Sequence, residues 1–200
     1  MKLGILDILF TSNTKSISNC LDLLNMNYDI INSSKQINQY DKIIFPGVGS
    51  FDLAVKVLKE KKIDKILKSK KLKPKFLCIC LGMQILFSKG YENINSKGLS
   101  IINGNVTKIS DKKTPKIGYS KIEFKSKDLF KDISKNSELY FMHSYGCESR
   151  GKKYETSLVK YGKKKYISSL KYKNFVGVQF HPENSKEEGL KIIKNFLNEK

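Results

Sequence analysis

The strongest constraint on the fold is a short apolar run that ends on a cysteine and is followed at once by a glycine-containing turn. Residues 76–80 have the sequence FLCIC, and LGMQ follows at residues 81–84. A continuous apolar run of this length is typical of a strand buried on both faces, and Gly82 permits a sharp turn into a helix. The segment therefore predicts a central strand with Cys80 held at its tip, the arrangement of a nucleophile elbow.

The residues around Cys80 and near the end of the chain suggest a nucleophile and its base. A cysteine at such an elbow lies near the positive end of the following helix, which favours the reactive thiolate. The sequence QFHPE at residues 179–183 places His181 and Glu183 two positions apart, on one face of an extended segment. A base that is itself oriented by a carboxylate is what a thiol nucleophile needs. The sequence predicts a cysteine hydrolase with a Cys80-His181-Glu183 triad.

Apolar runs and helical stripes alternate along much of the chain, the pattern of a mostly parallel sheet with helices on both faces. Strands are expected at residues 3–10, 28–31, 42–45, 76–80 and 176–180, and helices at residues 12–25, 51–59, 63–70 and 186–197. Short alternating runs between residues 100 and 170 predict a small antiparallel β layer beside this core. We expect an α/β fold in one domain over residues 1–200.

The charge of the chain is strongly positive, with 38 Lys and Arg against 19 Asp and Glu and a formal net charge of +19. Such a surface suits contacts with phosphates, but Arg150 is the only arginine, and specific reading of bases depends on arginine. A solvated lysine-rich surface without nucleic acid is therefore the favoured interpretation. A nucleic-acid-binding module remains the alternative, and it predicts binding that weakens steeply with salt.

The cysteines and apolar segments indicate the compartment. The four cysteines, which show no regular framework, are Cys20, Cys78, Cys80 and Cys147. A reducing cytoplasm fits this pattern better than a disulfide-stapled secreted domain. A metal site that begins with the Cys78 and Cys80 pair lacks a second pair to complete it, so no metal is expected. No apolar stretch is long enough for a membrane span, and the N-terminus is better explained as a strand than as a signal peptide.

Four motifs, taken in order along the chain, resemble those of class I glutamine amidotransferases. They are PGVG at residues 46–49, CICLGMQ at 78–84, HSY at 143–145 and GVQFHPE at 177–183. The resemblance runs over the whole chain. It is strongest to glutaminases that deliver ammonia through a tunnel to a (β/α)8-barrel cyclase in histidine biosynthesis. It implies a flavodoxin-like fold, hydrolysis of L-glutamine without a cofactor, and a heterodimer with the barrel subunit.

The resemblance also implies a role for each catalytic residue. Cys80 would attack the side-chain amide of glutamine and form a γ-glutamyl thioester. His181 would take the thiol proton and return it to the leaving ammonia, while Glu183 holds the imidazole.

Binding of the substrate is expected to fall to backbone groups and to side chains beside the nucleophile. The oxyanion needs two donors, and one is expected to be the N–H of Leu81, directly after the nucleophile. The resemblance implies that the other is an N–H of the Gly47-Val48-Gly49 segment. The resemblance further implies that Gln84 binds the substrate glutamine and that Ser144 and Tyr145 lie on the substrate side.

Several alternatives remain at the level of the sequence. His143 is a competing candidate base, although a single strand histidine is usually structural. Residues 115–120 (PKIGYS) and Asn184 depart from the family pattern in segments where the family faces its synthase. The DILFTSN sequence after the first strand departs from the pattern as well. The alternative function is therefore that of a paralogue. Such paralogues feed ammonia to barrel synthases that make amidino groups on bacterial surface sugars. A further alternative is an inactive structural subunit, and the intact Cys80-His181-Glu183 triad argues against it.

Overall fold

The computed structural model describes residues 1–8, 13–93, 96–110, 114–124, 128–149 and 154–199. The helices are α1 (Asn13–Leu23), α2 (Phe51–Glu60), α3 (Ile63–Leu67), α4 (Leu81–Gln84) and α5 (Lys186–Asn198), with 3-10 turns η1 (Ile37–Gln39) and η2 (Pro182–Asn184). The strands of the first half are β1 (Leu3–Leu6), β2 (Asp29–Ile31), β3 (Lys42–Phe45), β4 (Lys75–Ile79), β5 (Phe87–Gly90) and β6 (Ser96–Lys97). The later strands are β7 (Ile102–Lys108), β8 (Lys116–Lys121), β9 (Glu123–Phe124), β10 (Glu138–His143), β11 (Tyr145–Ser149), β12 (Glu155–Tyr161), β13 (Lys164–Tyr172) and β14 (Phe175–Val178).

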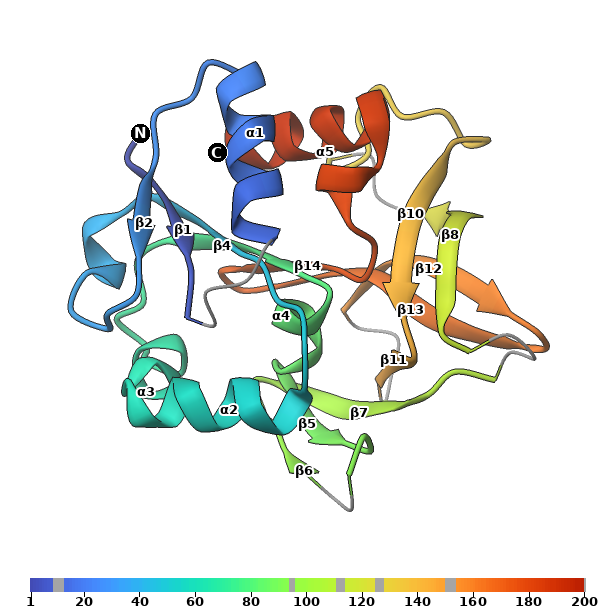
Figure 1. Ribbon diagram of the computed structural model, residues 1–200, viewed down its shortest axis with the longest axis horizontal. Helices are drawn as coiled ribbons and strands as arrows, with labels where there is room; N and C mark the ends of the chain where they lie inside the picture. The colour runs from blue at the N-terminus through green and yellow to red at the C-terminus, as the bar shows by residue number, and fades with distance from the viewer. Residues whose placement is uncertain (9–12, 94–95, 111–113, 125–127, 150–153, 200) are drawn as a thin grey trace.

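One large sheet runs through the molecule in the order β2-β1-β3-β4-β14-β13-β11-β7-β5-β6, with β12 paired to β13 and β9 to β12. The strands from β2 to β14 pair in parallel, whereas β13, β11 and β7 continue the sheet in antiparallel pairs. Strands β8 and β10 form a separate antiparallel pair. Helices α1 and α5 cover one face of the parallel strands, and α2 and α3 cover the other (Figure 1). The predicted α/β class with an antiparallel addition is confirmed.

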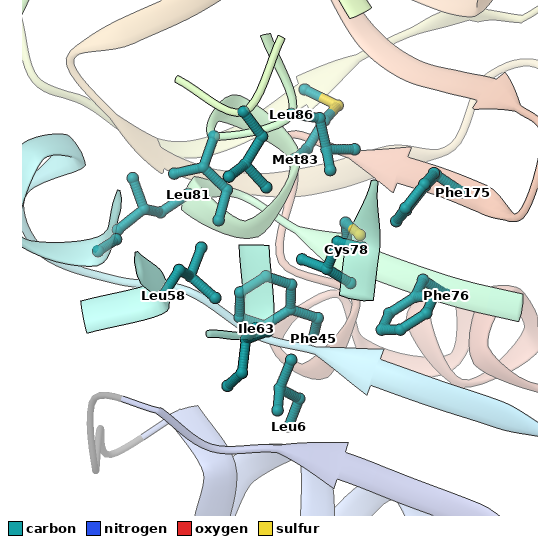
Figure 2. Packing of buried hydrophobic residues seen from close by; sticks show 14 of the residues in the cluster. Leu6, Phe45, Leu58, Ile63, Phe76, Cys78, Leu81, Met83, Leu86 and Phe175 are labelled. Atoms are coloured by element: carbon teal, nitrogen blue, oxygen red, sulfur yellow. The ribbon is translucent and has the colours of Figure 1, made fainter. Parts of the chain in front are cut away.

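The continuous apolar run before Cys80 is explained by burial on both faces of the sheet. Phe76 and Cys78 belong to the hydrophobic cluster beneath α2 and α3, shown in Figure 2. Leu77 and Ile79 point the other way and join the cluster beneath α1 and α5. Because successive strand residues point to opposite faces, a central strand of this kind has no polar side.

Three element boundaries differ from those expected. The helix after the elbow is only α4, because the chain turns at once into β5, where Phe87 pairs with Ile102 of β7. The helix predicted at residues 63–70 ends at Leu67, and the first strand ends at Leu6. Residues 9–12 of that strand and of the following helix lie outside the described part of the chain.

Helix α5 buries Ile192, Ile193, Phe196 and Leu197 against the sheet, while Leu190 is only partly buried. Among the described residues, no helix combines the length and the apolar character needed to cross a membrane.

Candidate active site

The carboxyl ends of two neighbouring parallel strands bring the predicted nucleophile and base to one edge of the sheet. Strands β4 and β14 pair in parallel, with Ile79 beside Val178. The N–H of Cys80 donates to the carbonyl of Val178 at 2.7 Å. His181 follows three residues after Val178, so Cys80 and His181 leave the sheet side by side. In open α/β sheets this edge is where ligands bind.

Cys80 has the strained backbone of a nucleophile elbow. Its φ is 51° and its ψ is −109°, a conformation that non-glycine residues rarely adopt. Helix α4 begins at the next residue. A Cβ on Gly82 would lie 2.4 Å from the carbonyl oxygen of Phe45, so only glycine fits where the elbow crosses β3. Cys80 is buried, with 6% of its surface exposed.

His181 and Glu183 form a buried pair within one tight turn. Nδ1 of His181 lies 2.8 Å from Oε1 of Glu183, and both side chains are fully buried. Because a carboxylate can only accept, Nδ1 carries the proton and Nε2 faces away from Glu183. Asn13, at the start of α1, donates from Nδ2 to the same carboxylate oxygen at 3.1 Å. Glu183 is therefore held from two sides.

The environment of His181 favours the imidazolium. Burial by itself lowers the pKa of His181, but the interactions with Cys80 and Glu183 outweigh it and raise the pKa to about 10. Nε2 makes no hydrogen bond of regular geometry within the described chain. Catalytic hydrogen bonds are often long before substrate binds and shorten in the complex. The pair is arranged for proton transfer between the Cys80 thiol and the imidazole.

A cavity of about 210 Å³ opens in front of Cys80. It is lined by Val48, Gly49, Cys80, Leu81, Gln84, Glu92, Met142, His143, Ser144 and Tyr145. Pockets for drug-sized ligands span roughly 300–1,000 Å³, so this one suits a molecule the size of an amino acid. Of the predicted substrate-side residues, all but Gly47 line it.

One predicted oxyanion donor is engaged by the protein itself. The N–H of Leu81 donates to the carbonyl of Gly47 at 3.3 Å. A Cβ on Gly47 would lie 2.6 Å from the N of Gly82, so glycine is what allows this close approach. For the N–H of Leu81 to reach a bound oxyanion, the Gly47 carbonyl has to turn away.

The amide of Gln84 is also committed to protein atoms. Its Nε2 donates to the carbonyl of Tyr145 at 2.8 Å and to Oε1 of Gln179 at 3.1 Å. Any contact with a ligand in the cavity therefore falls to the side-chain oxygen of Gln84. Its role as a substrate-binding residue stays a prediction.

His143, the competing candidate base, lies in the cavity wall with both ring nitrogens engaged. Nδ1 lies 2.8 Å from the carbonyl of Tyr145, and Nε2 lies 2.9 Å from the hydroxyl of Tyr161. Nδ1 must donate to the carbonyl, so Nε2 accepts from the hydroxyl. Burial is the main cause that lowers the pKa of His143 to about 4. His143 therefore fits the structural interpretation and not that of a base.

Two residues of the site were not found from the sequence. Glu92 lines the cavity, and its Oε2 accepts from the N–H of Phe51 at 2.7 Å, at the start of α2. Asn13 supports Glu183 from the opposite end of the chain. Glu92 lies outside the four motifs, and Asn13 ends the DILFTSN segment that departs from the family pattern, so only the folded chain brings them to the site.

Comparisons with known proteins agree with this geometry. Residues 6–200 match the family Glutamine amidotransferase class-I. Among solved structures, a glutamine amidotransferase aligns with 98% of this chain and 97% of its own at 15% identity, with a TM-score of 0.70. A glutamine amidotransferase from Thermotoga maritima aligns with 99% of this chain and 83% of its own at 17% identity, with a TM-score of 0.64. At these identities the structural likeness supports the fold alone.

The chain belongs to the class I glutamine amidotransferase family, as its motifs suggested. Its curated relatives carry a more particular name, imidazole glycerol phosphate synthase subunit HisH. The relative from Methanocaldococcus jannaschii is 40% identical over 203 residues, covering 98% of each chain. That from Caldanaerobacter subterraneus is 36% identical over 198 residues, covering 97% of this chain and 96% of its own.

Proposed function

We propose that this chain is the glutaminase subunit of an imidazole glycerol phosphate synthase in histidine biosynthesis. It hydrolyses L-glutamine to glutamate and ammonia, and the ammonia passes through a tunnel to a (β/α)8-barrel cyclase in a cytoplasmic heterodimer. The observation that carries the proposal is Cys80 on a strained elbow, facing a small cavity and next to a histidine held by Glu183. The near full-length likeness to HisH subunits supports the pathway.

Catalysis starts from the Cys80 thiolate, whose proton is held on Nε2 of His181, since the raised pKa of His181 favours the imidazolium. The thiolate attacks the amide carbon of glutamine, and the charge moves to the carbonyl oxygen of a tetrahedral intermediate. Glu183 stabilises the imidazolium through its bond to Nδ1. The imidazolium then protonates the leaving nitrogen, ammonia departs, and Cys80 is left as a γ-glutamyl thioester. Water activated by His181 hydrolyses the thioester and releases glutamate.

The oxyanion hole forms only when the Gly47 carbonyl releases the N–H of Leu81. In the present conformation that N–H is occupied at 3.3 Å, so a rotation of the Gly47-Val48 peptide precedes oxyanion stabilisation. Loss of one such donor typically lowers kcat by roughly 10²–10³-fold. The unrotated peptide therefore keeps the free subunit slow.

Charge and polarity in the cavity suit the two ends of glutamine. Glu92 supplies a carboxylate for the α-ammonium group, and its other contact, with the N–H of Phe51, keeps it in place. The side-chain oxygen of Gln84 and the Ser144 segment are left to recognise the rest of the substrate. An acid opposite an ammonium gives selectivity for a free amino acid over a peptide amide.

The separate β8–β10 pair offers the docking face for the barrel subunit. Ile117, Tyr119 and Met142 are large apolar residues that remain exposed on it, at 59%, 39% and 40%. Met142 also lines the cavity, so a partner seated on this face covers the exit for ammonia. The hydroxyl of Tyr119 donates to the carbonyl of Asn184 at 3.2 Å, which joins the two segments that depart from the family pattern.

The test is glutamate release from glutamine by the purified chain, first alone and then with the histidine-pathway barrel subunit and its ribulosyl aminoimidazole ligand. Strong stimulation by the liganded partner is the expected result. Activity that ignores this partner, or failure to bind it, would move the assignment to a paralogue serving surface-sugar synthesis. Absence of glutamate release under all conditions would support an inactive structural subunit.

A further inference from the structure

Gln179 is a buried side chain at the active site that the proposed triad does not use. It follows β14 directly, two residues before His181, and is 0% exposed. We propose that Gln179 positions the Cys80 sulfur and favours its thiolate by donating a hydrogen bond from Nε2. The inference rests on the proposed function in one respect, that Cys80 is the nucleophile.

The contact with sulfur is direct. Nε2 of Gln179 lies 3.5 Å from Sγ of Cys80, within reach of an N–H···S hydrogen bond. A hydrogen bond donated to an ionised group stabilises the charged form. The carbonyl of Met142, 4.0 Å from the sulfur, can only accept and so serves the protonated thiol. Gln179 is thus a second donor to the thiolate, beside the imidazolium of His181.

The orientation of the Gln179 amide follows from the neighbouring groups. The carbonyl of Tyr145 can only accept, so Gln84 must present its NH2 group there, at 2.8 Å. The second N–H of Gln84 then points at Gln179, which must answer with Oε1, at 3.1 Å. Cys147 also donates to that oxygen, at 3.8 Å. With its oxygen engaged by two donors, Gln179 turns Nε2 toward Cys80.

Cys147 supports this polarity because its buried thiol stays protonated. Its side chain is fully buried, and burial is the main cause that raises the pKa of Cys147 well above its ordinary value. The thiol therefore remains a donor to Oε1 of Gln179. An amide that flipped would set its NH2 group against two donors, which a buried site does not tolerate.

The backbone holds donor and sulfur at a defined separation. The N–H of Gln179 donates to the carbonyl of Ser168 at 2.8 Å, and the N–H of Cys80 donates to the carbonyl of Val178 at 2.7 Å. Both residues are thus pinned to neighbouring strands before substrate arrives. A donor fixed in advance acts without reorganisation during the reaction.

The test is the pH dependence of Cys80 alkylation by iodoacetamide in the wild type and in Gln179→Met, which keeps the shape but lacks the donor. Mass spectrometry locates the modified cysteine. We expect alkylation at pH 7 to slow roughly tenfold and its pH midpoint to rise by about one unit. With glutamine as substrate, kcat should fall by a similar factor while KM changes less than about twofold. A folded Gln179→Met with an unchanged alkylation profile would overturn the proposal.

Asn174→Leu is the matched control. Asn174 precedes β14 at its other end, and its amide donates to the carbonyls of Leu72, Lys73 and Pro74. Loss of these bonds lowers stability without touching the sulfur, so the alkylation profile should keep its midpoint. An equal shift in Asn174→Leu would show that Gln179 acts only through the fold.

If Gln179→Met does not fold, Gln179→Glu replaces it in the alkylation test. The carboxylate has the same shape and still accepts from Gln84, but it places negative charge where an N–H stood. The alkylation midpoint should rise further than in Gln179→Met, and an unchanged midpoint would contradict the assignment. Alkylation does not depend on glutamine hydrolysis. A wild type that releases no glutamate, alone or with the liganded barrel subunit, would therefore refute the proposed function and leave this test intact.

Discussion

The parallel and antiparallel regions of the molecule each contribute one buried histidine to the site, and the two environments are opposite. His181, after β14, lies between Cys80 and a carboxylate, which raise its pKa to about 10. His143, at the end of β10, is surrounded by a carbonyl and a hydroxyl without an opposing charge, and burial lowers its pKa to about 4. Burial alone disfavours the imidazolium in both places, so the charged partners of His181 are what raise its pKa.

The largest effect is expected from variants at the charged site, where His181 lies beside Cys80. Cys80→Ala and His181→Asn should each reduce glutamate release by more than about 10³-fold, since triad members act as a unit. Far-UV circular dichroism and binding of the barrel subunit should be unchanged. Supplied ammonium should restore the synthase reaction in the complex, because only the nitrogen source has been lost. Retained glutaminase activity in Cys80→Ala would refute the mechanism.

A smaller effect is expected at His143, the neutral histidine of this comparison. His143→Phe removes the two buried hydrogen bonds with Tyr145 and Tyr161 and should lower the free energy of unfolding by about 1–3 kcal/mol in urea titrations. The pH profile of kcat should keep its shape, because this histidine exchanges no proton in the reaction. Loss of a titration step from that profile would mean that His143, and not His181 alone, acts as a base.

Substitution of Asn13 tests how the protein holds the His181-Glu183 pair in place. Asn13→Ala removes the second hydrogen bond to Glu183 and should lower kcat roughly tenfold, equivalent to about 1.4 kcal/mol. KM for glutamine should change little, since Asn13 does not line the cavity. Asn13→Asp is a sharper variant, because a second carboxylate there cannot donate and repels Glu183. Equal kcat in the wild type and both variants would remove Asn13 from the mechanism.

The pH dependence of stability should have opposite signs for the two histidines. Folding lowers the pKa of His143 from 6.5 to about 4. The contribution of His143 to the free energy of unfolding is therefore present above pH 6.5 and is lost as the pH falls toward 4. His181 goes from 6.5 to about 10, so its contribution is present below pH 6.5 and is lost as the pH rises toward 10. Each slope is at most about 1.4 kcal/mol per pH unit.

Urea unfolding at pH values from 5 to 10 measures how the free energy of unfolding changes with pH, on the acid limb set by His143 and on the alkaline limb set by His181. His143→Phe should flatten the acid limb only, and His181→Asn the alkaline limb only. Cys80→Ala should move the alkaline loss toward lower pH, because the interaction with Cys80 is among the causes that raise the pKa of His181. A single variant that flattens both limbs would show that the two sites titrate together.

The sequence predicted the elbow because its determinants are local. The apolar run, Cys80 and Gly82 are adjacent in the chain, and the strand and the strained turn lie where they were expected. The closeness of His181 and Glu183 follows from their spacing of two positions, but the expected extended segment was wrong, because Pro182–Asn184 form a 3-10 turn that brings the two side chains together. The short α4 was not predicted, because its end depends on the pairing of β5 with the distant β7.

What the sequence by itself determined about this protein is its family, its α/β architecture and the identity of three candidate catalytic residues, all carried by contiguous motifs. Only the tertiary structure decided which histidine is charged, that the Gly47 carbonyl occupies the N–H of Leu81, and that Asn13, Glu92 and Gln179 belong to the site. The bond from Asn13 to Glu183 spans 170 positions, and that from Gln179 to Cys80 spans 99. Burial and partners at such separations set the protonation state of each group, and no local pattern encodes them.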